Sequence, residues 1–571
     1  MIGRPPFFHP ARRHPGDADQ ALETGRTRLL FTGAMFACAF AVVALRLVDV
    51  TLLKEGAGQR SAQLSAAPVL QTGRADIVDR NGVLLATSLK TASLYANPHL
   101  IIDAHEAAAK LVKAVPELSR EQVYARLVSD KSFVWLYRHL TPRQQYEVNR
   151  LGIPGFDFIT EERRVYPAGP LAAHALGHTD VDNHGLAGVE RQFDETLRTG
   201  GAPLRLSIDT RVQHAMREEL GRAMRAFRAV GAAGIVQDAH TGELIAMVSL
   251  PDFDPNLPAS IDSESRFNRA TLGVYEMGST FKIFTSAMAL DAGTVTMQGG
   301  YDAREPIRVS RFVIRDFHGK RRWLSVPEIF MYSSNIGAAR MALDVGTAGQ
   351  RSFLSKIGML RPAPVEISEV GQPILPGQWR DISTMTIGFG HGLAVSPVQL
   401  STGVVAMVNG GVLYPPTLIR RDSPTRAGTR VVSARTSGEI RRMMRLVVED
   451  GTGRNAEARG YLVGGKTGTA EKVMGKRYKA KALMSSFVGA FPINAPRYVI
   501  FAMLDEPSGT KETLGYATGG WVAAPVVRNV VYRIAPILGI HPVDEGSPAI
   551  RQQLAIDIVT KESGKRRLAS F

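Results

Sequence analysis

Residues 275–290 read YEMGSTFKIFTSAMAL, and the interpretation of the whole chain starts from this stretch. Ser279 and Lys282 stand three positions apart at its start, and the apolar residues that follow predict a buried helix. On a helix, residues i and i+3 share a face, so the Lys282 amine would lie beside the Ser279 hydroxyl. Burial lowers the pKa of a lysine, which leaves some neutral amine to take the serine proton. The stretch therefore predicts a serine nucleophile with a lysine base.

The same Ser-x-x-Lys spacing occurs a second time at Ser508 and Lys511, so the pattern alone does not identify a nucleophile. Glycine and proline flank this second copy, which predicts a loop in which the spacing fixes no geometry. Ser279 instead opens a predicted helix, whose N-terminus offers backbone N–H groups and a positive dipole end to a developing oxyanion. We therefore expect Ser279 to be the reactive serine.

Two further motifs follow Ser279 along the chain. Ser333-Ser334-Asn335 stands between two helical patterns, where an ordinary helix cap is the alternative interpretation. Lys466-Thr467-Gly468-Thr469 follows two glycines and reads as an edge strand, for which a solvated strand end is the alternative. In the chemical interpretation, Lys466 holds a substrate carboxylate by its charge and the threonine hydroxyls hydrogen-bond it. Gly468 would let the backbone of a bound peptide lie close to the strand.

Ser-x-x-Lys, Ser-x-Asn and Lys-Thr-Gly, in this order, resemble the signature of penicillin-binding proteins and serine β-lactamases. Over roughly residues 30–535 the chain is similar to class B penicillin-binding proteins. This similarity rests on the apolar run near the N-terminus and on residues 74–86, 164–190, 275–282, 333–337 and 388–400. Met277 departs from the family, which usually has proline there. The departure affects the turn before Ser279 and not the reacting groups.

The resemblance implies an α/β (α+β) penicillin-binding transpeptidase fold, in which helices flank an antiparallel sheet. It also implies an N-terminal transmembrane helix and an elongated pedestal domain before the sheet. Local patterns agree with this fold. Strands are predicted at residues 204–208, 234–249, 485–492 and 498–504. Helices are predicted at residues 210–227 and 524–538, and two short helices at residues 104–128. A strand, a turn and a second strand are predicted at residues 74–86.

The chemistry implied by the resemblance is acyl transfer. Ser279 would attack the carbonyl of a D-Ala-D-Ala stem peptide, with Lys282 as general base. Ser333, helped by Lys466, would pass a proton to the leaving amine. An amine of a neighbouring stem peptide then resolves the acyl-enzyme, and β-lactams acylate the same serine. The resemblance implies no metal and no cofactor.

Substrate binding is implied for the remaining motif residues. Asn335 would bind the donor peptide, and Thr467, Gly468 and Thr469 would bind the end of this peptide. The hydroxyls of the two threonines would hydrogen-bond its terminal carboxylate. The backbone N–H groups of Ser279 and Thr469 would form the oxyanion hole.

Four other enzyme or receptor classes share parts of this signature. A class A β-lactamase usually carries E-x-x-L-N, which this sequence lacks. A D,D-carboxypeptidase is a closer alternative, but its usual anchor is C-terminal. A penicillin-sensing receptor would need several membrane spans, and the chain has one candidate. A bifunctional class A penicillin-binding protein is excluded, because the chain has no long glycosyltransferase domain.

Asn335 in the second motif resembles division-type enzymes, whereas elongation-type enzymes typically carry S-x-D and remain the alternative. The division type implies septal cell-wall synthesis beside a SEDS-family glycosyltransferase and other membrane proteins of the divisome.

Composition excludes some other functions. The chain has 571 residues, which predicts two or more domains, and a net charge of +16. It has no zinc-ligand spacing and no basic-plus-aromatic RNA motif, so we interpret the charge as spread over the surface and not as a nucleic-acid site. His174 and His178 have the spacing i, i+4, but without an intervening glutamate structural histidines are favoured over zinc ligands.

The N-terminal apolar run predicts the topology. Residues 29–45 contain no charged side chain, and a helix of this length can cross a bilayer. No good cleavage site follows the run, which favours an uncleaved anchor in the cytoplasmic (inner) membrane. Several arginines precede the run, which favours a cytoplasmic N-terminus and therefore a periplasmic catalytic domain. The expected parts are a cytoplasmic segment (1–28), an anchor (29–48), a pedestal (49–205), a transpeptidase domain (206–540) and a loose C-terminal tail (541–571).

Overall fold

The computed structural model describes residues 30–31, 33–44, 73–309, 312–421, 428–474, 477–559 and 566–568. The chain divides into two units, Met1–Gln71 and Thr72–Phe571. In the first unit the described residues are helical, and the predicted anchor (29–48) lies partly outside them. None of the described helices has both the length and the apolar character needed to cross a membrane.

A sheet of five antiparallel strands forms the centre of the second unit, as the sequence predicts. In spatial order the strands are β16 (Gly464–Met474), β17 (Arg477–Phe491), β18 (Tyr498–Asp505), β6 (Gly231–Asp238) and β7 (Leu244–Leu250). The predicted hairpin over 234–249 and the strands near 485–492 and 498–504 are confirmed. β16, which carries the Lys-Thr-Gly-Thr motif, lies at the edge of this sheet.

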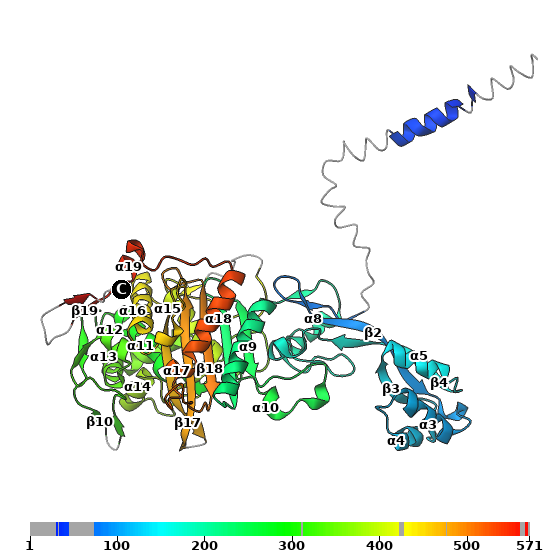
Figure 1. Ribbon diagram of the computed structural model, residues 1–571, viewed down its shortest axis with the longest axis horizontal. Coiled ribbons are helices and arrows are strands. Elements are labelled where there is room, and N and C mark those ends of the chain that lie inside the picture. Colours follow the sequence, from blue (N-terminus) through cyan, green and yellow to red (C-terminus); the bar gives the residue numbers. More distant parts are fainter. Residues whose placement is uncertain are drawn as a thin grey trace, which may run out of the picture. The chain divides into compact units, whose positions relative to one another are not determined.

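Helices cover both faces of the sheet, because alternate residues of each strand point to opposite sides. Ala232 and Val236 of β6 pack in a core with α9 (Thr210–Ala226) and α18 (Ala524–Ile537). Ala233 and Ile235 pack in a second core with α11 (Lys282–Ala292), α15 (Pro397–Val408) and α16 (Ala434–Glu449). Figure 1 shows β17 and β18 between these two groups of helices. Strands buried on both faces explain their nearly continuous apolar sequences.

The residues before 206 contain a sheet of their own. It consists of β1 (Ile77–Val78), β2 (Leu84–Ala96), β3 (Val134–Leu140), β4 (Phe156–Val165) and β5 (Leu204–Arg205). Three helices, α3 (Ala104–Ala114), α4 (Arg120–Leu127) and α5 (Pro142–Arg150), share a separate core with β2 and β3. The two predicted helices over 104–128 are confirmed. Because residues 72–571 form one compact unit, the pedestal boundary at 205 stays a prediction.

Two blocks that the sequence analysis singled out, 74–86 and 164–190, meet at a buried carboxylate. Glu190 is 0% exposed, and its two oxygens accept hydrogen bonds from Arg74 Nε at 2.6 Å and Arg164 Nε at 2.7 Å. A buried carboxylate needs such partners, and removal of one arginine would leave an uncompensated charge. These residues therefore fix the N-terminal strands against the loop that follows β4.

Other elements complete the fold. The remaining helices are α6 (Ala173–Leu176), α7 (Gly188–Gln192), α8 (Asp194–Arg198), α10 (Ser263–Arg266), α12 (Val326–Tyr332), α13 (Asn335–Lys356), α14 (Asp381–Gly388), α17 (Gly519–Val522) and α19 (Pro548–Leu554). The 3-10 turns are η2 (Pro98–Leu100), η3 (Gly169–Ala172), η4 (Pro258–Ser260), η5 (Gly278–Phe281) and η6 (Arg454–Ala456). The short paired strands are β8 (Tyr275–Glu276) with β13 (Ala394–Val395), β9 (Gly300–Asp302) with β12 (Trp323–Ser325), β10 (Ile307–Val309) with β11 (Phe312–Ile314), β14 (Val412–Leu413) with β15 (Thr429–Arg430), and β19 (Asp557–Val559) with β20 (Arg566–Leu568).

The expectation of a loose C-terminal tail is wrong for residues 543–556. Leu554 and Ile556 are each 4% exposed and belong to the main hydrophobic core. Val543 N donates to Gly460 O at 2.8 Å, and Gln553 Nε2 donates to Asn494 O at 2.8 Å. The polar composition of the tail concealed the two apolar residues that hold it against the body.

Candidate active site

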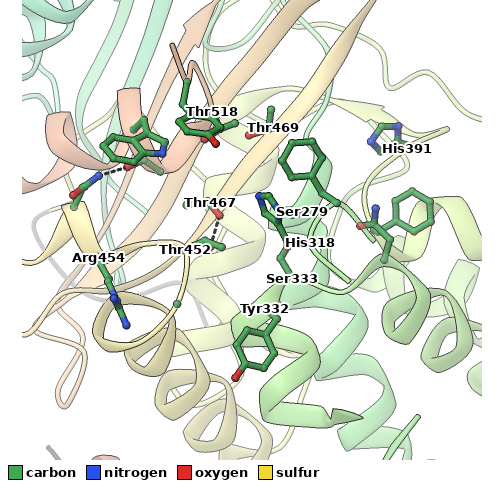
Figure 2. Close-up of a pocket in the computed structure, with 18 residues that line it drawn as sticks. Ser279, His318, Tyr332, Ser333, His391, Thr452, Arg454, Thr467, Thr469 and Thr518 are labelled. Atoms are coloured by element: carbon green, nitrogen blue, oxygen red, sulfur yellow. Dashed lines mark hydrogen bonds between the residues drawn. The ribbon is translucent and has the colours of Figure 1, made fainter. Parts of the chain in front are cut away.

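The three motifs meet in one cavity of about 600 Å³. Ser279, Ser333, Asn335, Thr467 and Thr469 all line it, from η5, the α12–α13 junction and β16 (Figure 2). The loops around Phe317, His391, Thr452 and Thr518 complete the wall. No aspartate or glutamate occurs among the described residues that line this cavity. The polar side chains that line it carry hydroxyl, imidazole, amide, indole and guanidinium groups.

Ser279 lies in the 3-10 turn η5, one turn earlier than the α-helix that the sequence predicted it to open. Gly278 fixes this turn, because its φ of +54° belongs to the left-handed region and a Cβ there would lie 2.6 Å from Thr469 O. The close approach brings the backbone of Ser279 beside the backbone of Thr469. These are the two groups proposed for the oxyanion hole.

Lys282 begins α11, and its terminal nitrogen reaches both serines. Lys282 Nζ lies 3.0 Å from Ser279 Oγ and 3.0 Å from Ser333 Oγ. It lies 2.7 Å from Ser333 O and 2.7 Å from Asn335 Oδ1. The side chain is buried, and burial, followed by the charge of Lys466, holds the pKa of Lys282 well below its ordinary value of 10.5.

These four contacts fit a neutral amine. A neutral amine has two hydrogens and one lone pair, and the two carbonyl-type oxygens at 2.7 Å can only accept. If they take the two hydrogens, the lone pair of Lys282 remains for a serine hydroxyl. Lys282 can therefore accept the Ser279 proton from a distance at which a hydrogen bond already exists.

Ser333 connects the two lysines. It lies between α12 and α13 with φ of +61°, an unusual conformation for a residue with a side chain. This conformation places its hydroxyl 3.0 Å from Lys282 Nζ and 3.0 Å from Lys466 Nζ. The four groups Ser279, Lys282, Ser333 and Lys466 form a continuous hydrogen-bonded path, along which a proton can travel.

Lys466 is more buried than expected of a lysine on an edge strand that binds a substrate by its charge. It is 0% exposed, and its Nζ donates to Ser333 Oγ at 3.0 Å and to Thr467 O at 3.4 Å. Burial lowers the pKa of Lys466 to about 7. Of the motif residues on β16, the described lining of the cavity includes Thr467 and Thr469 but not Lys466. Its geometry therefore favours proton transfer through Ser333 over direct contact with a substrate carboxylate.

Asn335 makes internal contacts in this structure. Its Oδ1 accepts from Lys282 Nζ at 2.7 Å, and its Nδ2 donates to Arg315 O at 3.1 Å. The neighbouring Ser334 Oγ and Ile336 N both donate to Asp316, at 2.7 and 3.0 Å. Asp316 thus anchors the second motif, and sequence reasoning missed it because a loop carboxylate carries no motif of its own.

The two threonines of β16 point into the cavity, and each hydroxyl has one partner within the protein. Thr467 Oγ1 lies 2.7 Å from Thr452 Oγ1, and Thr469 Oγ1 accepts from Gly519 N at 3.1 Å. The hydroxyl hydrogen of Thr469 is therefore available to a ligand in the cavity, and that of Thr467 is available when Thr452 donates in the pair between them. Because a carboxylate only accepts hydrogen bonds, two such donors suit one.

Gly468 has a packing reason of its own within the protein. A Cβ at this position would lie 2.4 Å from Ser486 Oγ and 2.7 Å from Met277 O. Both atoms belong to the protein, on the side of β16 away from Thr467 and Thr469. Gly468 is therefore required for the segment before Ser279 to pack against β16, and its predicted contact with a substrate backbone stays a prediction.

Two other predicted features lie apart from the cavity lining. Ser508 N donates to Phe227 O at 2.7 Å in the loop after β18, so this serine belongs to a different part of the fold. Buried His174 has its Nε2 2.8 Å from Ser265 O, as expected of a structural histidine. Among the residues that the structure describes, no group of three or more potential ligands surrounds a metal position.

Comparison with known proteins agrees with this geometry. A model described as "Penicillin binding protein transpeptidase domain" matches residues 232–532, and one described as "Penicillin-binding Protein dimerisation domain" matches residues 69–202. A relative from Caulobacter vibrioides, "Probable peptidoglycan D,D-transpeptidase FtsI", is 41% identical over 82% of this chain and 82% of its own length. A relative from Neisseria gonorrhoeae, "Probable peptidoglycan D,D-transpeptidase PenA", is 32% identical over 90% of this chain and 92% of its own.

A solved structure, a peptidoglycan synthetase from Bifidobacterium adolescentis, shares the fold with a TM-score of 0.66 at 21% identity. It covers 84% of this chain and 98% of its own. The fold, the motif geometry and the extent of these matches agree, and the chain therefore belongs to the class B penicillin-binding proteins.

Proposed function

We propose that this penicillin-binding protein is a peptidoglycan D,D-transpeptidase that cross-links stem peptides through an acyl-enzyme on Ser279. The observation that carries the proposal is the position of Lys282 Nζ, 3.0 Å from both Ser279 Oγ and Ser333 Oγ in a buried site. The names of the Caulobacter and Neisseria relatives support the same reaction class.

In acylation, Ser279 Oγ attacks the carbonyl carbon between the two terminal D-alanines, and its proton passes to the neutral Lys282 amine. The N–H groups of Ser279 and Thr469 stabilise the oxyanion of the tetrahedral intermediate. When the C–N bond breaks, the leaving amine receives a proton through Ser333. Lys282 and Lys466, on either side of Ser333, are the sources of that proton.

Substrate recognition falls to the groups that face the cavity. The hydroxyls of Thr467 and Thr469 donate to the terminal carboxylate of the donor. Asn335 binds the donor backbone through the capacity of its amide that Lys282 and Arg315 leave unused. A β-lactam, whose carboxylate resembles that of D-alanine, acylates Ser279 in the same way.

The cellular setting is part of the proposal. The protein acts in septal wall synthesis, beside a SEDS-family glycosyltransferase and other divisome proteins, as Asn335 in the second motif and the FtsI name of a relative suggest. An anchor over 29–48 holds it in the cytoplasmic membrane, and a pedestal over 49–205 carries the transpeptidase domain on the periplasmic side. The apolar run and the preceding arginines support this topology.

The test uses the full-length protein, its Ser279→Ala variant and a matched Ser508→Ala control. Each is incubated with a synthetic D-Ala-D-Ala donor and an amine acceptor, and both D-alanine release and cross-linked product are measured. We expect Ser279→Ala to lose both products and Ser508→Ala to keep both. Release of D-alanine without cross-linked product in the native protein would instead identify a D,D-carboxypeptidase.

A further inference from the structure

We propose that Arg454 binds a carboxylate of the acceptor stem peptide, at a subsite separate from the one that holds the donor terminus. The inference rests on the proposed function and adds to it the recognition of the second substrate.

The cavity continues beyond the threonines of β16. Gly451, Thr452, Arg454 and Asn455, from the segment after α16, line it together with Tyr332. Figure 2 shows Arg454 on the far side of the Thr452–Thr467 hydrogen bond from Ser279. The cavity therefore has a part near the nucleophile and a part around Arg454.

The donor cannot fill the part around Arg454. Its chain ends in the terminal carboxylate, and in the proposed function this carboxylate is bound by Thr467 and Thr469, which line the cavity. Past this point the donor has no atoms left. The acceptor amine takes the place of the departed D-alanine, so the rest of the acceptor peptide extends in the direction in which the donor stops. The part of the cavity around Arg454 lies in that direction.

The charge of this part suits an acidic peptide. Arg454 is the one permanently charged residue among the described residues that line the cavity, and none of them is acidic. Its side chain is 65% exposed, and its Nη2 lies 3.3 Å from Asp450 O and 3.6 Å from Asp450 Oδ1. An exposed pair of this kind is weak, and most of the five N–H donors of the guanidinium stay available to a ligand. Lys320 Nζ, 4.6 Å from the centre of the Tyr332 ring, adds positive charge beside another residue that lines the cavity.

The backbone on both sides of Arg454 is fixed, so its side chain is presented from a rigid segment. Thr452 is held by its hydrogen bond to Thr467, and Asn455 Nδ2 donates to Gly520 O at 2.9 Å. Gly451 N and Gly453 N both donate to Val447 O, at 3.1 and 3.0 Å. Gly520 is needed for this packing, since a Cβ there would lie 2.4 Å from Thr452 O.

Arg454 would act in the second half-reaction only. The acceptor amine attacks the carbonyl carbon of the acyl-enzyme, a C–N bond forms, and the bond to Ser279 Oγ breaks. The amine proton returns to Ser279 through Lys282. A carboxylate beside the attacking amine would occupy the threonine site, so Arg454 recognises a different carboxylate farther along the acceptor.

The test separates the two half-reactions in the full-length protein. The variants are Arg454→Ala, Arg454→Lys and, as control, Arg435→Ala, whose arginine is 67% exposed at the other end of α16. Acylation is followed with a β-lactam. Transfer is followed with a D-Ala-D-Ala donor and two acceptors: a stem tripeptide with free carboxylates, and the same tripeptide with its carboxylates amidated except the one beside the attacking amine.

For Arg454→Ala we expect the acceptor KM of the acidic tripeptide to rise on the order of tenfold, as for loss of a charge-assisted hydrogen bond. The KM of the amidated tripeptide and the β-lactam acylation rate should change less than about twofold. The KM of Arg454→Lys for the acidic tripeptide should lie between those of the native protein and Arg454→Ala. The KM of Arg435→Ala for this tripeptide should equal that of the native protein. Equal KM changes for the two acceptors, or a parallel fall in acylation, would overturn the inference. Absence of acylation in the native protein would refute the proposed function instead.

Discussion

Replacing Lys466 by methionine should stabilise the protein at neutral pH while it removes activity. The lysine is 0% exposed, and burial lowers its pKa from 10.5 to about 7. Each pKa unit corresponds to about 1.4 kcal/mol, so this burial costs the folded state about 5 kcal/mol at and below pH 7. Methionine has nearly the same shape and no charge. It loses the hydrogen bonds to Ser333 Oγ and Thr467 O, which contribute about 1 kcal/mol each. The net gain in unfolding free energy is then about 3 kcal/mol.

The pH dependence identifies the cause. Because the folded-state pKa is depressed, the unfolded protein binds the extra proton between pH 7 and 10.5, and native stability rises with pH across that window. The advantage of Lys466→Met should therefore be full at and below pH 7 and shrink by about 1.4 kcal/mol per pH unit above it. Near pH 10 the variant should be slightly less stable than the native protein.

The assay is the thermal midpoint of both full-length proteins in detergent, at matched pH values from 6 to 10. Lys466→Leu provides a second apolar variant, in case methionine packs poorly. A lower midpoint for both variants at pH 7, or a difference that does not change with pH, would refute the argument that Lys466 is buried with a depressed pKa.

Three further outcomes follow from the structure. Lys282→Arg should lower the rate of β-lactam acylation by about 10²–10⁴-fold, because a guanidinium stays protonated and cannot act as a base; a rate near native would remove Lys282 from that role. Gly468→Ala should lower both acylation and the thermal midpoint, at a cost of about 1–3 kcal/mol for displacing η5 from β16, whereas a neutral result would contradict the contact with Met277. Leu554→Ala should destabilise the fold by about 2–4 kcal/mol in urea unfolding, while no change would restore the interpretation of a loose tail. 

The features that could be predicted from the sequence are those that depend on local patterns. Apolar runs bounded by turns identified β6, β7, β17 and β18, and a capping aspartate followed by apolar periodicity identified α9. The order of the three motifs identified the residues that meet in the cavity, because the spacing within each motif fixes a local geometry. Ser279, for example, needs only one turn of chain to reach Lys282.

The features that could not be predicted depend on contacts between distant segments. Asp316 and Thr452 have no motif, yet each holds a motif residue in position. Gly468 was assigned to substrate contact because the sequence does not reveal that η5 packs beneath β16. The burial of Lys466 was missed for the same reason, although its part in proton transfer through Ser333 was expected.

The most direct test of the account is the site of covalent modification by benzylpenicillin. The full-length protein is acylated, digested and analysed by mass spectrometry. The account predicts one adduct, on the peptide that contains Ser279, and no adduct in Ser279→Ala, while Ser508→Ala is labelled as the native protein is. An adduct on any other residue, or labelling that persists in Ser279→Ala, would contradict it.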